Sequence, residues 1–210
     1  MSVLYEQEIC VPVFKPNSII GIDLGIKDIV ITSDYEKYNN EKLIQKYEKR
    51  IKRKQKELSR KEKGSNNYYK WKQKLARLYS KLKNARKYLT HTITKKLTET
   101  NDIIVTETLK IKNMIKNHKL AKAITDVTLG EIIRQLEYKT KWKGKKLYKI
   151  DTYYPSSQLC SICGYQNKMT KDLSVRKYTC PRCGSELDRD YNAAENILFE
   201  GIKQYMLELI

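Results

Sequence analysis

The chain has 210 residues, which is enough for one domain of ordinary size and a small additional module. Its formal net charge of +19 favours a polyanionic partner, and nucleic acid over a membrane, because no long apolar run is present. The first 17 residues have neither the apolar core of a signal peptide nor the composition of a transit peptide. We therefore expect a cytoplasmic, nucleoid-associated protein without a membrane partner, whose five cysteines are thiols or metal ligands rather than disulfides.

Five short apolar segments predict β-strands. They are residues 3–14, 18–25, 28–32, 102–107 and 147–151. The second and third should pair as a hairpin, and the first should be an edge strand because prolines limit it. The second strand ends in Asp23 and the fourth in Glu107, so a carboxylate follows each buried run. Amphipathic helices are predicted over residues 129–142, ended by Gly144, and from Asp190 towards the C-terminus.

The segment 41–89 is strongly basic, with 19 lysines and arginines against 4 acidic residues. Apolar residues recur at heptad-like spacing on either side of a turn at residues 64–67, which predicts an antiparallel helical hairpin with a basic exterior. A merely solvated face is the alternative, but charge of one sign costs self-repulsion unless phosphates neutralise it. The expected nucleic-acid contacts are Lys49, Arg50, Lys52, Arg53, Lys54, Lys56, Lys72, Lys74 and Arg77.

Four cysteines form two pairs with metal-ligand spacing. Cys160 and Cys163 make the first pair, Cys180 and Cys183 the second, and sixteen residues separate the pairs. This spacing is typical of a four-cysteine zinc ribbon, and it favours one structural zinc ion over two redox dithiols. Since no ligand position is left open, zinc should hold the shape of the ribbon and not perform hydrolysis. Cys10 lies outside the pattern and is expected to be a small apolar filler.

Three carboxylates stand at the ends of predicted elements: Asp23, Glu107 and Asp190. Each has a simpler explanation, as a turn residue, a strand-end charge and a helix N-cap respectively. Adjacent strands would place Asp23 beside Glu107, and the last helix can bring Asp190 over them. Hydrolysis of a phosphodiester with two divalent metals needs hard oxygen ligands that converge from separate elements. The three carboxylates are therefore candidates to bind two divalent metal ions.

Four motifs, in this order, resemble the TnpB (OrfB) family of transposon-encoded proteins, relatives of the type V CRISPR effectors. They are Gly21–Lys27, Val105–Leu109, Tyr154–Gly164 and Asp188–Ile197. The resemblance implies an α/β fold with a ribonuclease H-like (RuvC) mixed sheet, interrupted by the zinc ribbon. It also implies RNA-guided cleavage of DNA with Mg²⁺. The catalytic triad would be Asp23, Glu107 and Asp190, with Asp188 as a secondary acidic candidate.

The expected organisation has three parts. Residues 1–152 would form the nuclease core, with the basic hairpin 41–89 inserted, residues 153–187 the zinc ribbon, and residues 188–210 the last motif and helix. The chain departs from the family at Thr108, where an acidic residue is usual. It also opens almost directly at the first catalytic strand, so we expect the N-terminal recognition lobe of the family to be missing or supplied by another chain.

The function expected from these observations is a metal-dependent DNA endonuclease of the TnpB type, with DNA and a guide RNA as partners. The alternative is a truncated, non-cleaving nucleic-acid-binding protein of a transposon. An ATPase of the actin and sugar-kinase type also begins with a Gly-Ile-Asp-Leu-Gly strand. No second glycine-rich phosphate loop is visible, however, and the chain has only eight glycines.

Overall fold

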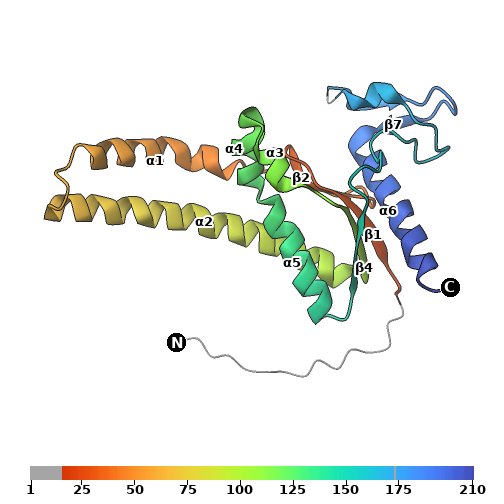
Figure 1. Cartoon of the computed structure of the whole chain (residues 1–210), viewed down its shortest axis with the longest axis horizontal. Coiled ribbons are helices and arrows are strands. Elements are labelled where there is room, and N and C mark those ends of the chain that lie inside the picture. Colours follow the sequence, from red (N-terminus) through yellow and green to blue (C-terminus); the bar gives the residue numbers. More distant parts are fainter. Residues whose placement is uncertain (1–15, 173) are drawn as a thin grey trace.

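The computed structural model describes residues 16–172 and 174–210 (Figure 1). The strand expected over residues 3–14 and the apolar role expected for Cys10 therefore lie outside the described residues. Within the described residues, no helix is both long enough and apolar enough to span a membrane.

A five-stranded mixed sheet forms the centre of the molecule, in the order β3-β2-β1-β4-β5. Its strands are β1 (Ile19–Asp23), β2 (Asp28–Thr32), β3 (Lys37–Asn39), β4 (Ile103–Glu107) and β5 (Lys146–Ile150). β2 pairs antiparallel with β1 and β3, whereas β4 pairs parallel with β1 and β5. The hairpin predicted for residues 18–25 and 28–32 and the ribonuclease H-like mixed sheet are confirmed.

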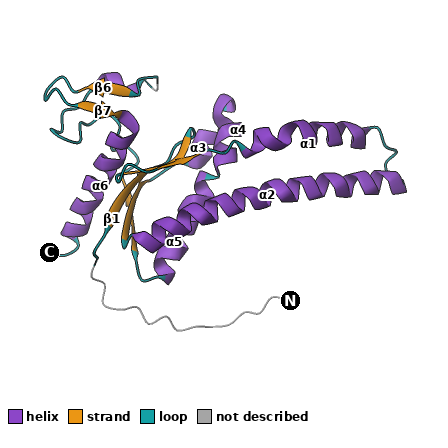
Figure 2. Ribbon diagram, turned by 180° about the vertical axis from the view of Figure 1, so that it is seen from behind, coloured by secondary structure: helices purple, strands orange, loops and turns teal. Residues whose placement is uncertain are grey.

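Helices cover both faces of the sheet (Figures 1 and 2). On one face, Ile20, Ile22 and Ile104 pack against buried side chains of α2, α4 and α5. On the other face, Ile103 and Val105 pack against α6 through Ile197. The side chains of β4 thus alternate between two apolar layers, as expected for a strand buried on both faces.

Two glycines let α6 (Arg189–Leu207) lie directly on the sheet. A β-carbon on Gly21 in β1 would come within 2.3 Å of the carbonyl oxygen of Ala194. A β-carbon on Gly201 in α6 would come within 2.3 Å of Val105 in β4. Both distances are far below van der Waals contact, so the glycines fix how closely the helix approaches the strand that carries Asp23.

The basic hairpin consists of α1 (Leu43–Ser59) and α2 (Asn66–Thr100), which extend away from the sheet on the side opposite α6 (Figure 1). Leu43 and Ile51 of α1 pack with Leu78 and Leu82 of α2 in a buried seam. The predicted apolar interior of the hairpin is therefore confirmed.

The boundaries of α2 differ from those expected. The helix does not end at Leu89 but continues to Thr100, and Ile93 and Leu97 of this extension are 2% exposed in the core under the sheet. The helix also begins at Asn66, inside the turn that was expected at residues 64–67, because the hydroxyl of Ser65 accepts a hydrogen bond from the Tyr68 amide and caps the helix. One continuous helix therefore joins the hairpin to the core.

The segment between β4 and β5 contains three helices: α3 (Ile111–Ile115), α4 (His118–Val127) and α5 (Leu129–Trp142). α5 matches the prediction, and the chain leaves it through Gly144 in a left-handed conformation. The other two were not expected. The ribbon that follows β5 holds a short 3₁₀ helix (Lys168–Lys171) and the hairpin of β6 (Lys177–Thr179) and β7 (Glu186–Asp188).

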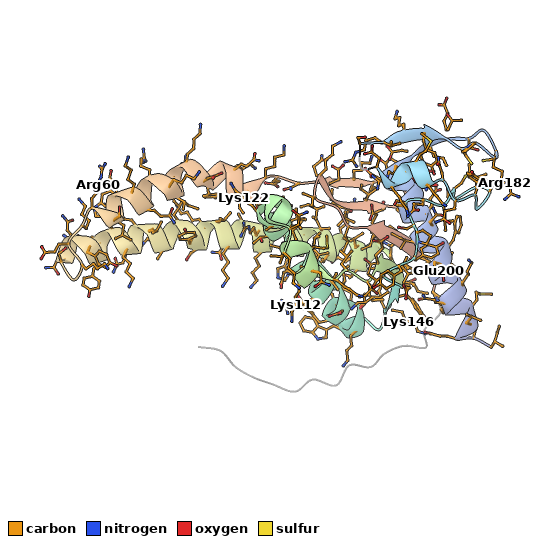
Figure 3. The ribbon with its side chains drawn as sticks, turned by 45° about the horizontal axis from the view of Figure 1, so that its top comes forward. Arg60, Lys112, Lys122, Lys146, Arg182 and Glu200 are labelled. Carbon is orange, nitrogen blue, oxygen red and sulfur yellow. The ribbon has the colours of Figure 1, made fainter. Side chains whose placement is uncertain are left out.

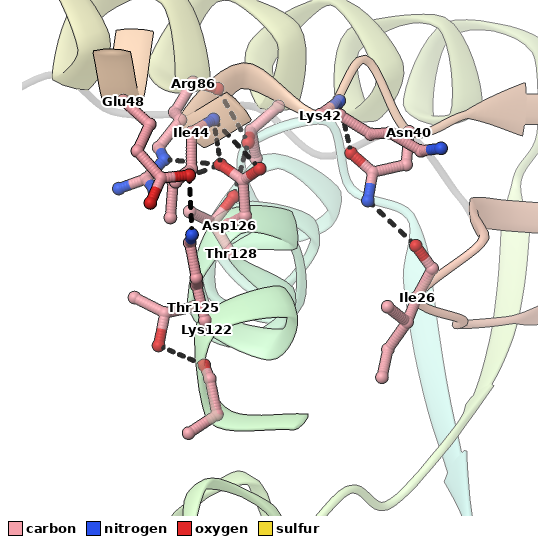
Figure 4. Close-up of polar contacts among 12 residues, drawn as sticks. Ile26, Asn40, Lys42, Ile44, Glu48, Arg86, Lys122, Thr125, Asp126 and Thr128 are labelled. Atoms are coloured by element: carbon pink, nitrogen blue, oxygen red, sulfur yellow. Dashed lines mark hydrogen bonds and ion pairs between the residues drawn. The ribbon is translucent and has the colours of Figure 1, made fainter. Parts of the chain in front are cut away.

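The base of the hairpin is held by polar contacts to α4 (Figure 4). The carboxylate of Asp126 accepts hydrogen bonds from the Ile44 amide at 3.0 Å and from the Arg86 guanidinium at 3.0 Å. A second contact joins Lys122 of α4 to Glu48 of α1 at 2.7 Å. Since α1 has no capping side chain of its own, Asp126 satisfies one of its free amide groups.

Candidate active site and zinc ribbon

Asp23, Glu107 and Asp190 line one cleft of about 830 Å³. The parallel pairing of β1 with β4 sets Ile22 opposite Thr106, so the next residue in each strand is a carboxylate at the same edge of the sheet. Asp190 lies in the first turn of α6, which packs over β1. Three elements that are distant in the sequence therefore deliver one carboxylate each to the same cleft.

The electrostatics of the cleft act most strongly on Asp23. Burial raises the pKa of Asp23 to about 7, and the nearby charges of Glu107 and Asp190 add to the rise. The positive charge of Arg189 and a hydrogen bond from the Leu24 amide oppose it. In the protein without a cation, Asp23 therefore holds its proton up to about neutral pH.

Glu107 is held by a residue outside the predicted set. The hydroxyl of Ser156, in the loop that follows β5, donates a hydrogen bond to a carboxylate oxygen of Glu107. Burial raises the pKa of Glu107, and this hydrogen bond lowers it. Ser156 is itself fixed, because its carbonyl accepts a hydrogen bond from Asn196 of α6 at 2.8 Å.

The two aspartates at the start of α6 have different surroundings. Asp188, and not Asp190, is the N-cap, because its carboxylate accepts hydrogen bonds from the amides of Asp190 at 3.0 Å and Tyr191 at 3.3 Å. Asp188 also forms an ion pair with Lys37. The capping explanation considered for Asp190 is therefore wrong, and Asp190 is left to face the cleft, where Arg176 contacts both its oxygens at 3.2 Å.

The donor set of the cleft suits a hard divalent cation. Carboxylate oxygens are the ligands that Mg²⁺ prefers, and a cation would relieve the repulsion that raises the pKa of Asp23. Among the described residues, the group of three or more potential ligands that is already close enough to hold a metal ion is the four cysteines, whose sulfur atoms lie within 4.8 Å of one another, and not the three carboxylates. Arg176 and Ser156 occupy oxygens of Asp190 and Glu107 in this arrangement.

The four cysteines converge as their spacing predicts. Sγ of Cys160 lies 3.7 Å from that of Cys183, and Sγ of Cys163 lies 3.6 Å from that of Cys180. Tetrahedral zinc with Zn–S bonds of about 2.3 Å requires sulfur separations of about 3.8 Å, whereas a disulfide requires about 2.05 Å. The cluster therefore fits a tetrahedral four-thiolate metal site and contains no disulfide.

Two asparagines of α6 attach the ribbon to the cleft. Asn192 donates a hydrogen bond to the Leu159 carbonyl at 2.6 Å and accepts one from the Ser161 amide at 2.8 Å. Asn196 donates to the same carbonyl at 2.7 Å. All three bonds are made by Leu159 and Ser161, the neighbours of Cys160, so the metal-binding loop and the helix that carries Asp190 are fixed to each other.

The basic residues predicted to contact nucleic acid all lie on α1 and α2. Figure 3 shows lysine and arginine side chains projecting along the hairpin, with Arg60 near its tip. All nine predicted residues are exposed, except Lys54, which is half-buried. Lys54 and Lys74 lie over the ring of Trp71, at 5.1 and 4.5 Å from its centroid. The exposed charge is available to phosphates, and part of it is steadied by an aromatic side chain.

Several residues of the site were not assigned a role from the sequence. They are Ser156, Arg176, Arg189, Asn192 and Asn196. All except Arg176 stand inside motifs that carried the family resemblance, so the motifs were a signal that these positions matter. Their partners lie up to 49 residues away, and no spacing rule connects them.

Comparisons with known proteins agree with this architecture. Residues 2–118 match the OrfB_IS605 family, described as "Probable transposase", and residues 130–197 match the family "Cas12f1-like, TNB domain". The chain is 39% identical to the "Putative RNA-guided DNA endonuclease" of Streptomyces pristinaespiralis, over 96% of this chain and 50% of that protein. InsQ of Escherichia coli (strain K12), which has the same description, is 34% identical over 96% of this chain and 53% of InsQ.

A solved structure also matches. The cryo-EM structure of a Cas12f1–sgRNA–target DNA complex superposes with a TM-score of 0.63 and 20% identity, over 90% of this chain and 51% of that chain. This match supports the overall fold of the chain.

The family match covers more than half of the chain, and the chain therefore belongs to the TnpB (OrfB) family. It spans about half the length of the curated relatives that it matches.

Proposed function

We propose that the chain is the nuclease part of a TnpB-type, RNA-guided DNA endonuclease that hydrolyses DNA phosphodiesters in a Mg²⁺-dependent reaction. The observation that carries this proposal is the convergence of Asp23, Glu107 and Asp190 on one cleft from β1, β4 and α6. The names of the relatives from Streptomyces pristinaespiralis and Escherichia coli support the class of reaction.

In this proposal, Asp23, Glu107 and Asp190 hold two magnesium ions. The chemistry such ions supply is activation of a water molecule and stabilisation of the leaving oxygen. Ser156 orients Glu107, and Asp188 positions Asp190 by capping α6. Asp188 then serves the site as a positioning residue, since its oxygens accept from amides and pair with Lys37.

The proposed role of the ribbon is structural and involves one zinc ion, bound by Cys160, Cys163, Cys180 and Cys183. Thiolate ligands at all four positions leave no site for a substrate or water. Through Asn192 and Asn196, zinc binding would stabilise the start of α6, where Asp190 lies.

The proposed partners are DNA and a guide RNA. The matching Cas12f1 structure is a complex with sgRNA and target DNA, and the hairpin of this chain carries the exposed positive charge that such partners require. A recognition lobe supplied by another chain would complete the assembly. The division at residues 152 and 187 also stays a proposal, and α2 lies within the first part and α6 within the last.

The test uses the assembled protein, with a recognition lobe and a guide RNA supplied. We expect guided, Mg²⁺-dependent DNA cleavage that is lost in Asp23→Ala, Glu107→Gln and Asp190→Ala, while DNA binding is retained. Thermal stability should rise with Mg²⁺ or Mn²⁺ in the wild type and not in Asp23→Ala, because the native state alone binds the cation. Equal cleavage by Asp23→Ala would disprove the assignment, and DNA binding without cleavage by the wild type would favour the non-cleaving alternative.

A further inference from the structure

Arg189 is a buried cation on the wall of the carboxylate cleft. It is the first residue of α6, between the capping Asp188 and the cleft-facing Asp190, and only 7% of it is exposed. Its amide donates a hydrogen bond to the Arg176 carbonyl at 2.8 Å, so its backbone position is fixed. Its side chain lines the same cleft as Asp23 and Glu107.

Among the described residues, the guanidinium of Arg189 forms no hydrogen bond or ion pair, although its charge opposes the rise in the pKa of Asp23 and helps to lower the pKa of Asp172. Its Nε is buried and has no hydrogen-bond acceptor among the described residues, and no described carboxylate forms an ion pair with it. Two other cations of the cleft are paired: Arg176 with Asp190 at 3.2 Å and Lys122 with Glu48 at 2.7 Å. An unpaired buried guanidinium is unfavourable, because its lost hydration is not replaced.

The fold itself gains little from a cation at this position. The N-terminus of a helix carries a partial positive charge, and a cation there is repelled by it. The charge of Arg189 does reach the cleft, since it opposes the rise in the pKa of Asp23. A positive side chain that is buried, unpaired and at the unfavourable end of a helix indicates an anionic ligand in the cleft.

We propose that Arg189 binds a non-bridging oxygen of the DNA phosphodiester that occupies the carboxylate cleft. This inference rests on the proposed function, because it takes the substrate of that cleft to be DNA. Phosphodiester oxygens match the planar, forked guanidinium group, which can donate two parallel hydrogen bonds to them. Negative charge grows on these oxygens during hydrolysis, so the same contact would strengthen in the transition state.

A purely structural role makes a different prediction. If Arg189 only compensates for the charges of Asp23 and Asp172, its replacement by glutamine lowers thermal stability and leaves phosphodiester binding unchanged. If Arg189 is a phosphate ligand, the replacement removes an unpaired buried charge. Thermal stability is then kept or raised, while phosphodiester binding falls.

The probe is the thymidine dinucleotide TpT, added to the 210-residue chain with Ca²⁺ present, and followed by NMR of the arginine Nε–H groups. The Arg189 signal is assigned by its disappearance in Arg189→Lys. We expect that signal to shift on addition of TpT and to remain in place with the uncharged methylphosphonate analogue. Affinity for TpT should fall about ten- to a hundred-fold in Arg189→Gln, which is the range for hydrogen bonds to a charged group.

Arg134→Gln is the matched control, since Arg134 is an exposed arginine of α5 that pairs with Glu131 outside the cleft. It should bind TpT as the wild type does. An unmoved Arg189 signal, or equal affinity in Arg189→Gln, would overturn the inference. If Arg189 binds TpT but the assembled protein never cuts DNA, the nuclease proposal fails and the phosphate contact stands.

Discussion

At the scale of single residues, burial and the negative charges of neighbouring carboxylates both disfavour ionisation of the carboxyl groups in the cleft. Asp23 is enclosed by protein atoms at the end of a buried strand, and Glu107 and Asp190 lie close enough to raise its pKa further. Arg189 offsets part of this effect without bonding to a carboxylate. A cation is the ligand that would let all three carboxylates ionise together, and this supports the divalent metal that we propose for the cleft.

The first prediction concerns the pH dependence of stability without metal. Because the folded-state pKa of Asp23 is about 7, well above its unfolded value of 3.8, the native state holds an extra proton between these values. Stability should therefore fall as pH rises through this window. The side chain keeps some solvent contact through the cleft, so we expect a loss of roughly 2–4 kcal/mol.

Thermal unfolding in chelator from pH 4 to pH 8 measures this effect. Asp23→Asn should show a smaller fall than the wild type, and the exposed control Asp34→Asn should follow the wild type. Parallel curves for Asp23→Asn and the wild type would show that Asp23 ionises normally in the fold.

The second prediction separates the two aspartates of α6. Asp188→Ala removes the N-cap and should cost about 1 kcal/mol of stability, whereas Asp188→Ser and Asp188→Asn keep an acceptor for the helix amides. Asp188→Asn should therefore retain guided cleavage by the assembled protein, and Asp190→Asn should lose it. The opposite ranking in a cleavage assay would make Asp188 the metal ligand.

At the scale of elements, α6 links the sheet, the cleft and the ribbon. It packs on β1 and β4 through Gly21 and Gly201, delivers Asp190, and holds the metal-binding loop by Asn192 and Asn196. Gly21 in β1 belongs to the Gly-Ile-Asp-Leu-Gly motif that also occurs in ATPases of the actin and sugar-kinase type. The structure gives it a packing role, since a methyl group there would strike α6.

The third prediction follows from this link. Cys180→Ser should release zinc, and the contacts of α6 with the loop at Leu159 should loosen, since structural zinc binding is also folding free energy of about 10–16 kcal/mol. Hydrogen exchange should then speed up at the Ser161 amide and in the first turns of α6, but not in α1. Metal analysis that finds no zinc in freshly purified wild type would contradict the ribbon assignment.

Elements with a strong local pattern were predictable from the sequence, and those defined by distant contacts were not. The seam of the hairpin follows a heptad spacing, and the cysteine pairs have a metal-ligand spacing, so both could be identified locally. The extension of α2 to Thr100 is decided by packing under the sheet. The five-residue α3 is too short to show a period, and the contact of Ser156 with Glu107 depends on the fold of the whole core.

At the scale of the whole molecule, the charge is divided between two regions with different tasks. The hairpin carries exposed lysines and arginines, while the cleft at the edge of the sheet gathers the carboxylates. α2 continues from the hairpin into the core under the sheet, and Asp126, which lines the cleft, fixes α1 and α2 to α4. Nucleic acid held along the hairpin would therefore have a defined position relative to the cleft.

The last prediction tests the hairpin as a phosphate-binding surface. Replacing Lys52, Arg53, Lys54 and Lys56 with glutamine should weaken DNA binding and flatten its dependence on salt, because each phosphate contact releases counterions. If all four residues contact phosphates, the slope of log K against log salt should fall by about 3 to 4. The measurement is a fluorescence-anisotropy titration with DNA at several salt concentrations, in chelator so that no cleavage occurs.

The matched control removes the same charge elsewhere. Lys168, Lys171, Lys177 and Arg182 are exposed on the ribbon, and their replacement by glutamine changes the net charge by the same four units. If both quadruple variants flatten the slope equally, net charge alone governs binding and the hairpin is only a solvated surface. We expect DNA affinity and its salt dependence to fall only in the hairpin variant, and the gain in thermal stability with Mg²⁺ to be unchanged in it. Nucleic-acid binding and cation binding would then belong to separate regions, because the hairpin and the carboxylate cleft use different residues.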